Sequence, residues 1–165
     1  MNPREMTPED HEQVDRLVQS SWGNNVLMLS QYRVHRGDWP VVERPKRTSL
    51  VVCPESEIVG VGTVFESTLH PRMYLVAINV SRAWQRQGVG SCLYSALAHE
   101  ASDKPWMVKL SRGDQAGRQF LQKRGFTEVA DTWMGVLDPT EAATQVWLAD
   151  LPGAVNGFEV LPLTE

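Results

Sequence analysis

Short apolar runs alternate along the chain with stretches whose apolar residues recur at helical spacing. The Val- and Leu-rich runs, bounded by turn residues, predict strands over residues 4–6, 49–53, 57–65, 73–80, 106–110, 127–137 and 144–148. Pro54 and its neighbours predict a hairpin turn between two of these strands. This alternation of strands and helices is typical of an α/β sandwich.

About four helices are expected between these strands. The first begins at Thr7, with Pro8 in its first turn and Asp10 where the acid of a capping box lies. A second is expected over residues 25–35, and the clearest covers 88–101, with one apolar stripe. The last covers 114–124 and ends at Gly125, a left-handed cap position, with Phe126 packing back.

Length and composition indicate an ordinary globular protein. The 165 residues are 42% hydrophobic and 22% charged, and the formal net charge is -4. A mildly acidic surface favours neither nucleic acid nor an anionic membrane as a partner. No apolar run has the roughly 20 residues that span a bilayer, and the polar first ten residues lack a signal-peptide core. We therefore expect a cytoplasmic protein.

Cysteines and histidines are few and scattered. Cys53 and Cys92 lie in apolar stretches and are expected to be reduced, buried thiols. The four histidines lack the spacing of a metal-binding helix, so we expect no metal site. Residues 1–150 are expected to form one domain, and residues 151–165 its final strand or tail. The alternative is that residues 157–165, which faintly echo the chain start, begin a second domain.

A glycine-containing turn joins the predicted strand 73–80 to the helix that follows it. It runs from Gln85 through Arg86, Gln87, Gly88 and Val89 to Gly90. Glycine lets the backbone approach an anion, and the first turn of a helix offers N–H groups and partial positive charge. The segment is therefore a candidate phosphate site, with Arg86 and Gln87 flanking the phosphates.

The same turn has a purely structural interpretation. It lacks the third glycine of the dinucleotide fingerprint and the Gly-Lys-Ser/Thr ending of a nucleotide P-loop. Taken alone, it is as consistent with a simple helix cap as with a phosphate site. A nucleotide-binding α/β protein is thus the least favoured interpretation.

Two ordered motifs make the chain resemble the GNAT superfamily of acyltransferases. Val80, Gln85, Gly88 and Gly90 match the spacing of its motif A. A second signature falls at Asp114, Gly117, Phe120, Gly125 and Phe126, where the family usually has Asn in place of Asp114. The resemblance covers roughly residues 4–137, and the order of the motifs makes it specific.

The resemblance implies a single GNAT-type domain. Its sheet is expected to be mixed and mostly antiparallel, with a central splayed parallel strand pair formed by 73–80 and 106–111. It also implies acetyl-CoA as cosubstrate, with the pyrophosphate on backbone N–H groups and the pantetheine arm on the edge of the first strand. The implied cofactor-binding residues are Ile78, Asn79, Val80, Gln85, Arg86, Gln87, Gly88, Val89, Gly90, Ser91 and Asp114.

The expected reaction is attack of an amine on a thioester. A primary alkylamine is mostly ammonium at pH 7, and its deprotonation costs about 4–5 kcal/mol, so a base is useful. Glu66, at the end of a predicted strand, is the first candidate, and Tyr74 and His70 are weaker ones. The alternative for Glu66 is a solvated carboxylate without a catalytic role.

One departure from the family concerns the leaving group. The family often has a Tyr beside the leaving thiolate, and that position is Leu121 here. A thiol leaves with a pKa near 8.5, so its protonation is only mildly needed at pH 7. Proximity and orientation can still supply most of the rate.

These arguments predict an N-acetyltransferase that acts on a primary amine of a small molecule or peptide. The expected oligomeric state is a monomer or homodimer. The acceptor is expected to contact Trp22, Tyr32 and Trp39, although two of these side chains have an alternative place in the core. The rival prediction is a non-catalytic acyl-CoA-binding module of a tandem or regulatory protein.

Overall fold

The computed structural model describes residues 1–22, 47–67, 70–130, 154–155 and 158–159. The chain divides into two compact units, Met1–Arg118 and Gln119–Glu165, each described by itself. The helix predicted at 25–35, the strand predicted at 144–148, and the side chains of Trp22, Tyr32 and Trp39 lie outside the described residues.

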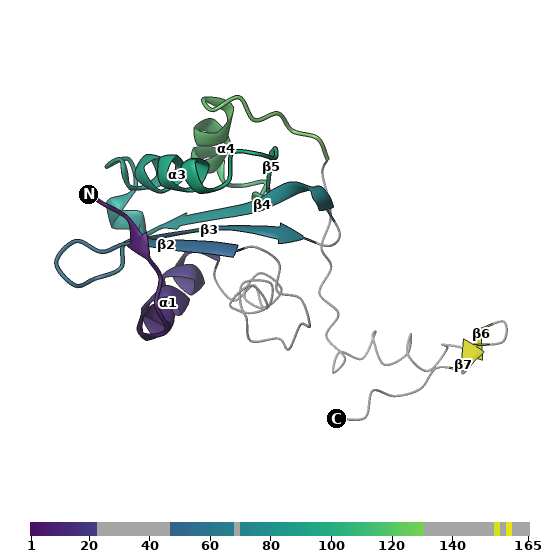
Figure 1. The fold of residues 1–165 in the computed structure, drawn as a ribbon, viewed down its shortest axis with the longest axis horizontal. Coiled ribbons are helices and arrows are strands. Elements are labelled where there is room, and N and C mark those ends of the chain that lie inside the picture. The colour runs from purple at the N-terminus through teal and green to yellow at the C-terminus, as the bar shows by residue number, and fades with distance from the viewer. Residues whose placement is uncertain (23–46, 68–69, 131–153, 156–157, 160–165) are drawn as a thin grey trace. The chain divides into compact units, whose positions relative to one another are not determined.

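The first unit is built on a five-stranded sheet (Figure 1). Its strands, in spatial order, are β1 (Arg4–Glu5), β2 (Arg47–Val52), β3 (Gly60–Ser67), β4 (His70–Val80) and β5 (Trp106–Val108). The first three pairings are antiparallel and β4 pairs with β5 in parallel. The mixed, mostly antiparallel sheet is thus confirmed, but its parallel pair lies at an edge of the described sheet and not at its centre.

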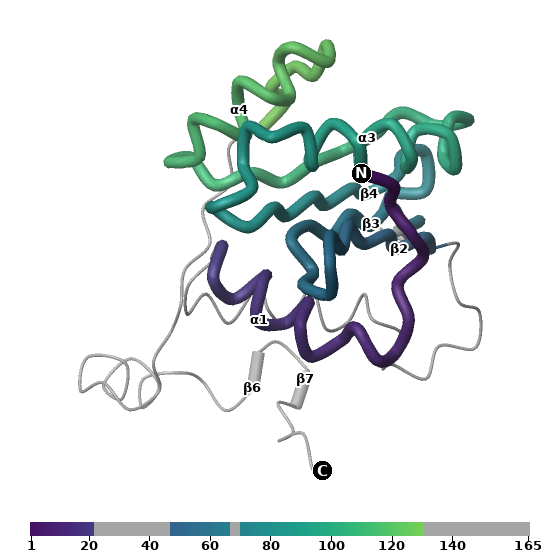
Figure 2. Tube along the Cα trace, turned by 90° about the vertical axis from the view of Figure 1, so that its left-hand side faces the viewer, coloured from purple at the N-terminus to yellow at the C-terminus, as the bar shows by residue number. Residues whose placement is uncertain are grey.

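Helices cover both faces of this sheet. Figures 1 and 2 show α1 (His11–Trp22) on one face and α3 (Val89–Glu100) on the other. Together with α4 (Gln115–Gln122), the described residues contain three α-helices, where about four were expected. Among these residues no helix has the length and apolar character needed to cross a bilayer.

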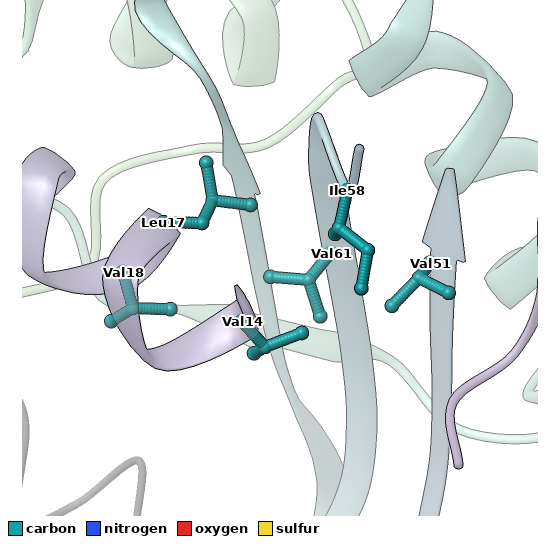
Figure 3. Close-up of a cluster of buried hydrophobic side chains, with 6 residues drawn as sticks. All are labelled: Val14, Leu17, Val18, Val51, Ile58 and Val61. Carbon is teal, nitrogen blue, oxygen red and sulfur yellow. The ribbon is translucent and has the colours of Figure 1, made fainter. Parts of the chain in front are cut away.

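One core cluster lies between α1 and the sheet. Val14, Leu17 and Val18 lie on one side of α1 because their spacing of three and four residues places them on one helical face. They pack against Val51, Ile58 and Val61 (Figure 3). The spacing of these residues in the sequence therefore gives α1 one buried apolar face.

The opposite face of the sheet approaches α3 closely because β3 has two glycines there. A Cβ added at Gly60 would lie 2.6 Å from a methyl carbon of Val89, and one at Gly62 would lie 2.9 Å from a methyl carbon of Leu97. Both distances are shorter than van der Waals contact. The absence of a Cβ at Gly60 and Gly62 therefore lets α3 lie this close to the sheet. The start of the helix is thereby held over the end of β4.

The expected helix start at Thr7 is confirmed, with η1 (Pro8–Asp10) as its first turn. The Asp10 carboxylate accepts the Thr7 N–H at 2.8 Å and two Arg4 guanidinium bonds at 2.7 Å each. The Arg4 guanidinium thereby holds the pKa of buried Asp10 far below its usual range. This contact joins β1 to the start of α1.

Gly125 ends α4 as expected, with a φ of 80°. The Phe126 N–H donates to the Leu121 carbonyl and the Gly125 N–H to the Gln122 carbonyl, which is the Schellman arrangement. Residues 127–130 are not a strand, contrary to the expectation for 127–137, whose remainder lies outside the described residues. Strand propensity depends strongly on tertiary context, so the composition of this stretch is not enough to make it a strand.

The end of the chain contains a small hairpin. Strand β6 (Ala154–Val155) pairs antiparallel with β7 (Phe158–Glu159). A final strand was one of the two expectations for this region. The boundary between the two units falls inside α4, well before residue 150, and the assignment of 1–150 and 151–165 stays a prediction.

Candidate functional site

The connection that contains the predicted phosphate turn leaves the sheet at Val80 and enters α3 at Val89. It contains the 3-10 turn η2 (Arg82–Trp84) and ends at Gly88, which has a φ of 89° and precedes the first helical residue. Backbone in this left-handed region favours glycine. Trp84 and Val89 pack on the core between α3 and the sheet, so apolar contacts hold the turn in place.

Backbone N–H groups cluster at this start of α3. The first N–H that the helix bonds internally is that of Cys92, which donates to the Gly88 carbonyl at 2.9 Å. The N–H groups of Val89 and Gly90 lie in the first turn of the helix, before its internal ladder begins. Gly88 supplies no side-chain cap. The arrangement provides the donors and the dipole of an anion site.

The side chains of two glutamines hydrogen-bond to the backbone of this connection. The Gln85 side-chain amide donates to the Val80 carbonyl at 3.2 Å, and that of Gln87 donates to the Ala83 carbonyl at 2.7 Å. Gln87 therefore binds the backbone of its own turn, where we expected its side chain to flank a phosphate. Arg86 is exposed, with a φ of 65°, and lies two residues before Gly88 as the cationic side chain of the turn.

The strand edge predicted to hold the pantetheine arm is the part of β4 that extends past its ladder with β5. We call this end of the strand pair, beyond Val76 and Val108, the wedge. The parallel register runs from Tyr74 opposite Trp106 to Val76 opposite Val108 and stops there. Strand β4 continues for four residues to Val80, which is about 13 Å of extended chain. Ile78, Asn79 and Val80 lie on this continuation. The expected parallel pair is thus present, and its ladder ends at Val76 and Val108, before the glycine turn; the splay of the two strands beyond that point stays a prediction.

Asp114 caps α4. Its Oδ1 atom accepts the Gly117 N–H at 2.8 Å, and its own N–H donates to the Ser111 carbonyl. This is the bonding of an N-cap residue. Its predicted contact with the pantetheine arm stays a prediction. Leu121 belongs to the second unit, and its place relative to the wedge is not described.

The predicted catalytic residues lie at the other end of β4. Glu66 on β3 is directly opposite Tyr74 on β4, and the exposed His70 begins β4. The Glu66 carboxylate forms an ion pair with Lys104 at 2.7 Å. The Tyr74 hydroxyl donates to Asp103 at 3.0 Å, and its ring is buried beneath α3. Their catalytic roles stay predictions.

Electrostatics at this end favour the protonated forms of Tyr74 and Lys104. Burial and the bond to Asp103 raise the pKa of Tyr74, so the phenol stays protonated. The bond to Glu66 raises the pKa of Lys104, which therefore stays an ammonium. Neither Tyr74 nor Lys104 is poised to accept a proton near pH 7.

Sequence reasoning did not identify Asp103 and Lys104. They lie in a polar connection between α3 and β5, and its composition resembles any exposed turn. The thiols of Cys53 and Cys92 are half-buried, not fully buried as expected. Within the described residues, no group of three or more His, Cys, Asp or Glu side chains could hold a metal.

Comparison with known proteins bears on the fold and the family of this chain. The protein smu.2055 of Streptococcus mutans UA159 is 21% identical over 79% of this chain and 85% of its own, with a TM-score of 0.63. The aminoglycoside acetyltransferase meta-AAC0020, from an uncultured soil metagenomic sample and solved with sisomicin, is 16% identical over 83% and 96%, with a TM-score of 0.59.

A third similar structure carries a CoA-containing ligand. AAC(6')-Iy, solved with the bisubstrate analog CoA-S-monomethyl-acetylneamine, is 13% identical over 83% of this chain and 97% of its own, with a TM-score of 0.58. No curated protein sequence matches this chain. The acetyltransferase (GNAT) family profile matches residues 11–126, more than half of the sequence. The chain therefore belongs to the acetyltransferase (GNAT) family.

Proposed function

We propose that this protein transfers an acetyl group from acetyl-CoA to a primary amine of a small molecule or peptide by direct attack. The observation that carries the proposal is the turn at Gly88, which presents the N–H groups of Val89 and Gly90 at the start of α3. These donors are suited to a diphosphate. The wedge beside Ile78–Val80 gives an extended ligand chain a strand edge to lie along.

The proposed acceptor class rests on chemistry and on similarity. Two of the similar structures are aminoglycoside acetyltransferases by name, and aminoglycosides carry alkylamines. Such an amine must lose a proton before it attacks, at a cost of about 4–5 kcal/mol at pH 7. Since Tyr74 and Lys104 both hold their protons, neither is suited to accept the proton of the amine.

Binding of CoA tests the cofactor part directly. A ligand present at 100 times its Kd stabilises the native state by about 2.7 kcal/mol, which raises the Tm of a domain this size by roughly 5–10 °C. We expect such a rise with CoA for the wild type. An unchanged Tm at millimolar CoA would exclude the proposed site.

Gly88→Val is the matched test of the turn. A branched side chain at a φ of 89° strains the backbone and covers the N–H groups, so CoA affinity should fall about 100-fold. Gly125→Val is the control, because Gly125 has a φ of 80° and equally open surroundings at the end of α4. It should lower the Tm comparably and keep the CoA-induced rise. Retention of that rise by Gly88→Val would mean that the turn is only a helix cap.

Turnover separates the enzyme from its rival. Release of the CoA thiol from acetyl-CoA, measured with a panel of primary amines, should occur with at least one amine. The rival candidate, a non-catalytic acyl-CoA-binding module, is favoured by Leu121 at the position where the family often has Tyr. Binding of CoA without turnover on any amine would establish that rival.

A further inference from the structure

Four side chains from three segments meet where the wedge between β4 and β5 closes. We call them the closed-end cluster: Glu66 on β3, Tyr74 on β4, and Asp103 and Lys104 in the connection before β5. We propose that this cluster positions the thioester end of acetyl-CoA by fixing where β5 joins β4, and that Glu66 acts there as a positioning residue. The inference rests on the proposed function.

The contacts within the cluster cross-link every segment. Lys104 Nζ lies 2.7 Å from Glu66 Oε1 and 5.1 Å from the centre of the Tyr74 ring. The Tyr74 hydroxyl donates to Asp103 Oδ1 at 3.0 Å. The Tyr74 N–H also donates to the Pro105 carbonyl at 2.9 Å. The residues just before β5 are thus bonded to β3 and β4 by two side chains and by backbone.

Strand β5 needs such support because it is short. Its ladder with β4 has only three residue pairs, and an isolated pairing of this length contributes little stability. Further contacts hold its first residue, Trp106: its indole N–H donates to the Ala101 carbonyl at 2.8 Å, and its ring meets Tyr94 edge to face at 5.1 Å. The direction in which β5 leaves β4 beyond Val76 therefore depends on its N-terminal attachment.

That direction sets the width of the wedge. A ligand chain that enters from the Gly88 turn and lies along Ile78–Val80 has its far end nearest the closed-end cluster. The diphosphate end lies beyond Val80, which is about 20 Å along β4 from Tyr74, and contacts different residues. Disturbing the cluster should therefore weaken binding of the acyl-pantetheine part and leave binding of the diphosphate part unchanged.

Two probes separate these parts. Acetyl-CoA reports on both ends of the site, and 3′-phosphoadenosine 5′-diphosphate reports on the turn alone. By calorimetry, Lys104→Met and Glu66→Gln should each weaken acetyl-CoA about tenfold, since small misplacements are costly, and change the diphosphate affinity less than about twofold. The double variant should be no weaker than either single variant, because both remove the same contact.

Kinetics distinguish positioning from base catalysis. In the positioning role, Glu66→Gln raises the KM for acetyl-CoA as Lys104→Met does, and the pH profile of kcat keeps its acidic limb. Lys104→Arg, which retains the charge, should restore most of the affinity. If Lys104→Met does not fold, the comparison of Lys104→Arg with Glu66→Gln still tests the pair.

Other outcomes would overturn the inference. A lower kcat and a lost acidic limb in Glu66→Gln, at unchanged acetyl-CoA affinity, would make Glu66 the base. Unchanged acetyl-CoA affinity in both single variants would also refute it, whereas a wild type that binds neither probe would refute the proposed function itself. The control pair is Glu12→Gln and Arg16→Met, which break an exposed ion pair on α1 and should change neither probe.

Discussion

The two ends of β4 are built in different ways. At its C-terminal end, the strand runs into a turn whose candidate ligand groups are backbone N–H groups, held in place by Gly88 and by two glutamine side chains bonded to the same turn. At its N-terminal end, the organising contacts are an ion pair, a phenol–carboxylate bond and a cation over a ring. These contacts come from three separate segments.

This difference bears on what each end can tolerate. A backbone site depends on conformation and close approach, so adding a carbon atom nearby is the damaging change. A side-chain cluster depends on matched charges, so removing one partner is the damaging change. The predictions below test these two sensitivities and begin with the largest expected effect.

Adding a methyl group beneath α3 should separate stability from binding. Gly60→Ala places a Cβ 2.6 Å from Val89, the first residue of α3, and Gly62→Ala places one 2.9 Å from Leu97, two turns further on. Overpacking of this kind costs about 1–3 kcal/mol. Both variants should unfold at lower urea concentration, but only Gly60→Ala should also weaken CoA binding, because it displaces the start of α3.

The same pair of variants can contradict the view that the Gly88 turn depends on close backbone approach. Equal CoA affinity in both, measured by calorimetry on folded protein, would mean that the turn does not depend on the closeness of α3 to the sheet. Equal loss in both would mean that the whole helix moves as one body.

Removing the charge of Asp10 should lower the stability of the fold without changing the affinity for CoA. Asp10→Asn weakens the bonds from Arg4 and Thr7, and the free energy of unfolding at pH 7 should fall by about 2 kcal/mol. CoA affinity should stay unchanged. The exposed pair is the control, since Glu12→Gln should cost under about 1 kcal/mol.

The pH dependence of this effect follows from the direction of the pKa shift. The pKa of Asp10 is depressed in the folded state and is about 3.9 in the unfolded chain. Its contribution is therefore fully present above about pH 4 and is lost as the pH falls toward the folded value. Urea unfolding at pH 7 and pH 3 should show the difference between wild type and Asp10→Asn shrinking at the lower pH. A constant difference would contradict the ionic origin of the contact.

The smallest expected effect is at Leu121. Leu121→Tyr should leave CoA affinity unchanged and raise turnover modestly at low pH, if protonation of the leaving thiolate limits the rate there. Leu121→Phe adds a ring without the hydroxyl and is the matched control. The same pH profile in both variants would count against a role for a proton donor at this position.

Local sequence accounts for much of the fold and for one end of the site. The strands over β2, β3 and β4, the stripe of α1 and the cap at Gly125 follow from the periodicity of side chains and from special residues, which act over a few positions. The turn at Gly88 could be predicted for the same reason, because a left-handed glycine before an apolar helix is a local feature.

Only the tertiary structure shows the closed-end cluster, and it shows where the predictions from sequence were wrong. The meeting of Glu66 and Tyr74 with Asp103 and Lys104 depends on the order of strands in the sheet, which brings together residues 38 positions apart. Likewise, residues 127–130 were predicted to be part of a strand and are not one, because strand propensity depends on tertiary context. Backbone conformation is thus determined locally, whereas contacts between side chains of different segments depend on how the chain packs.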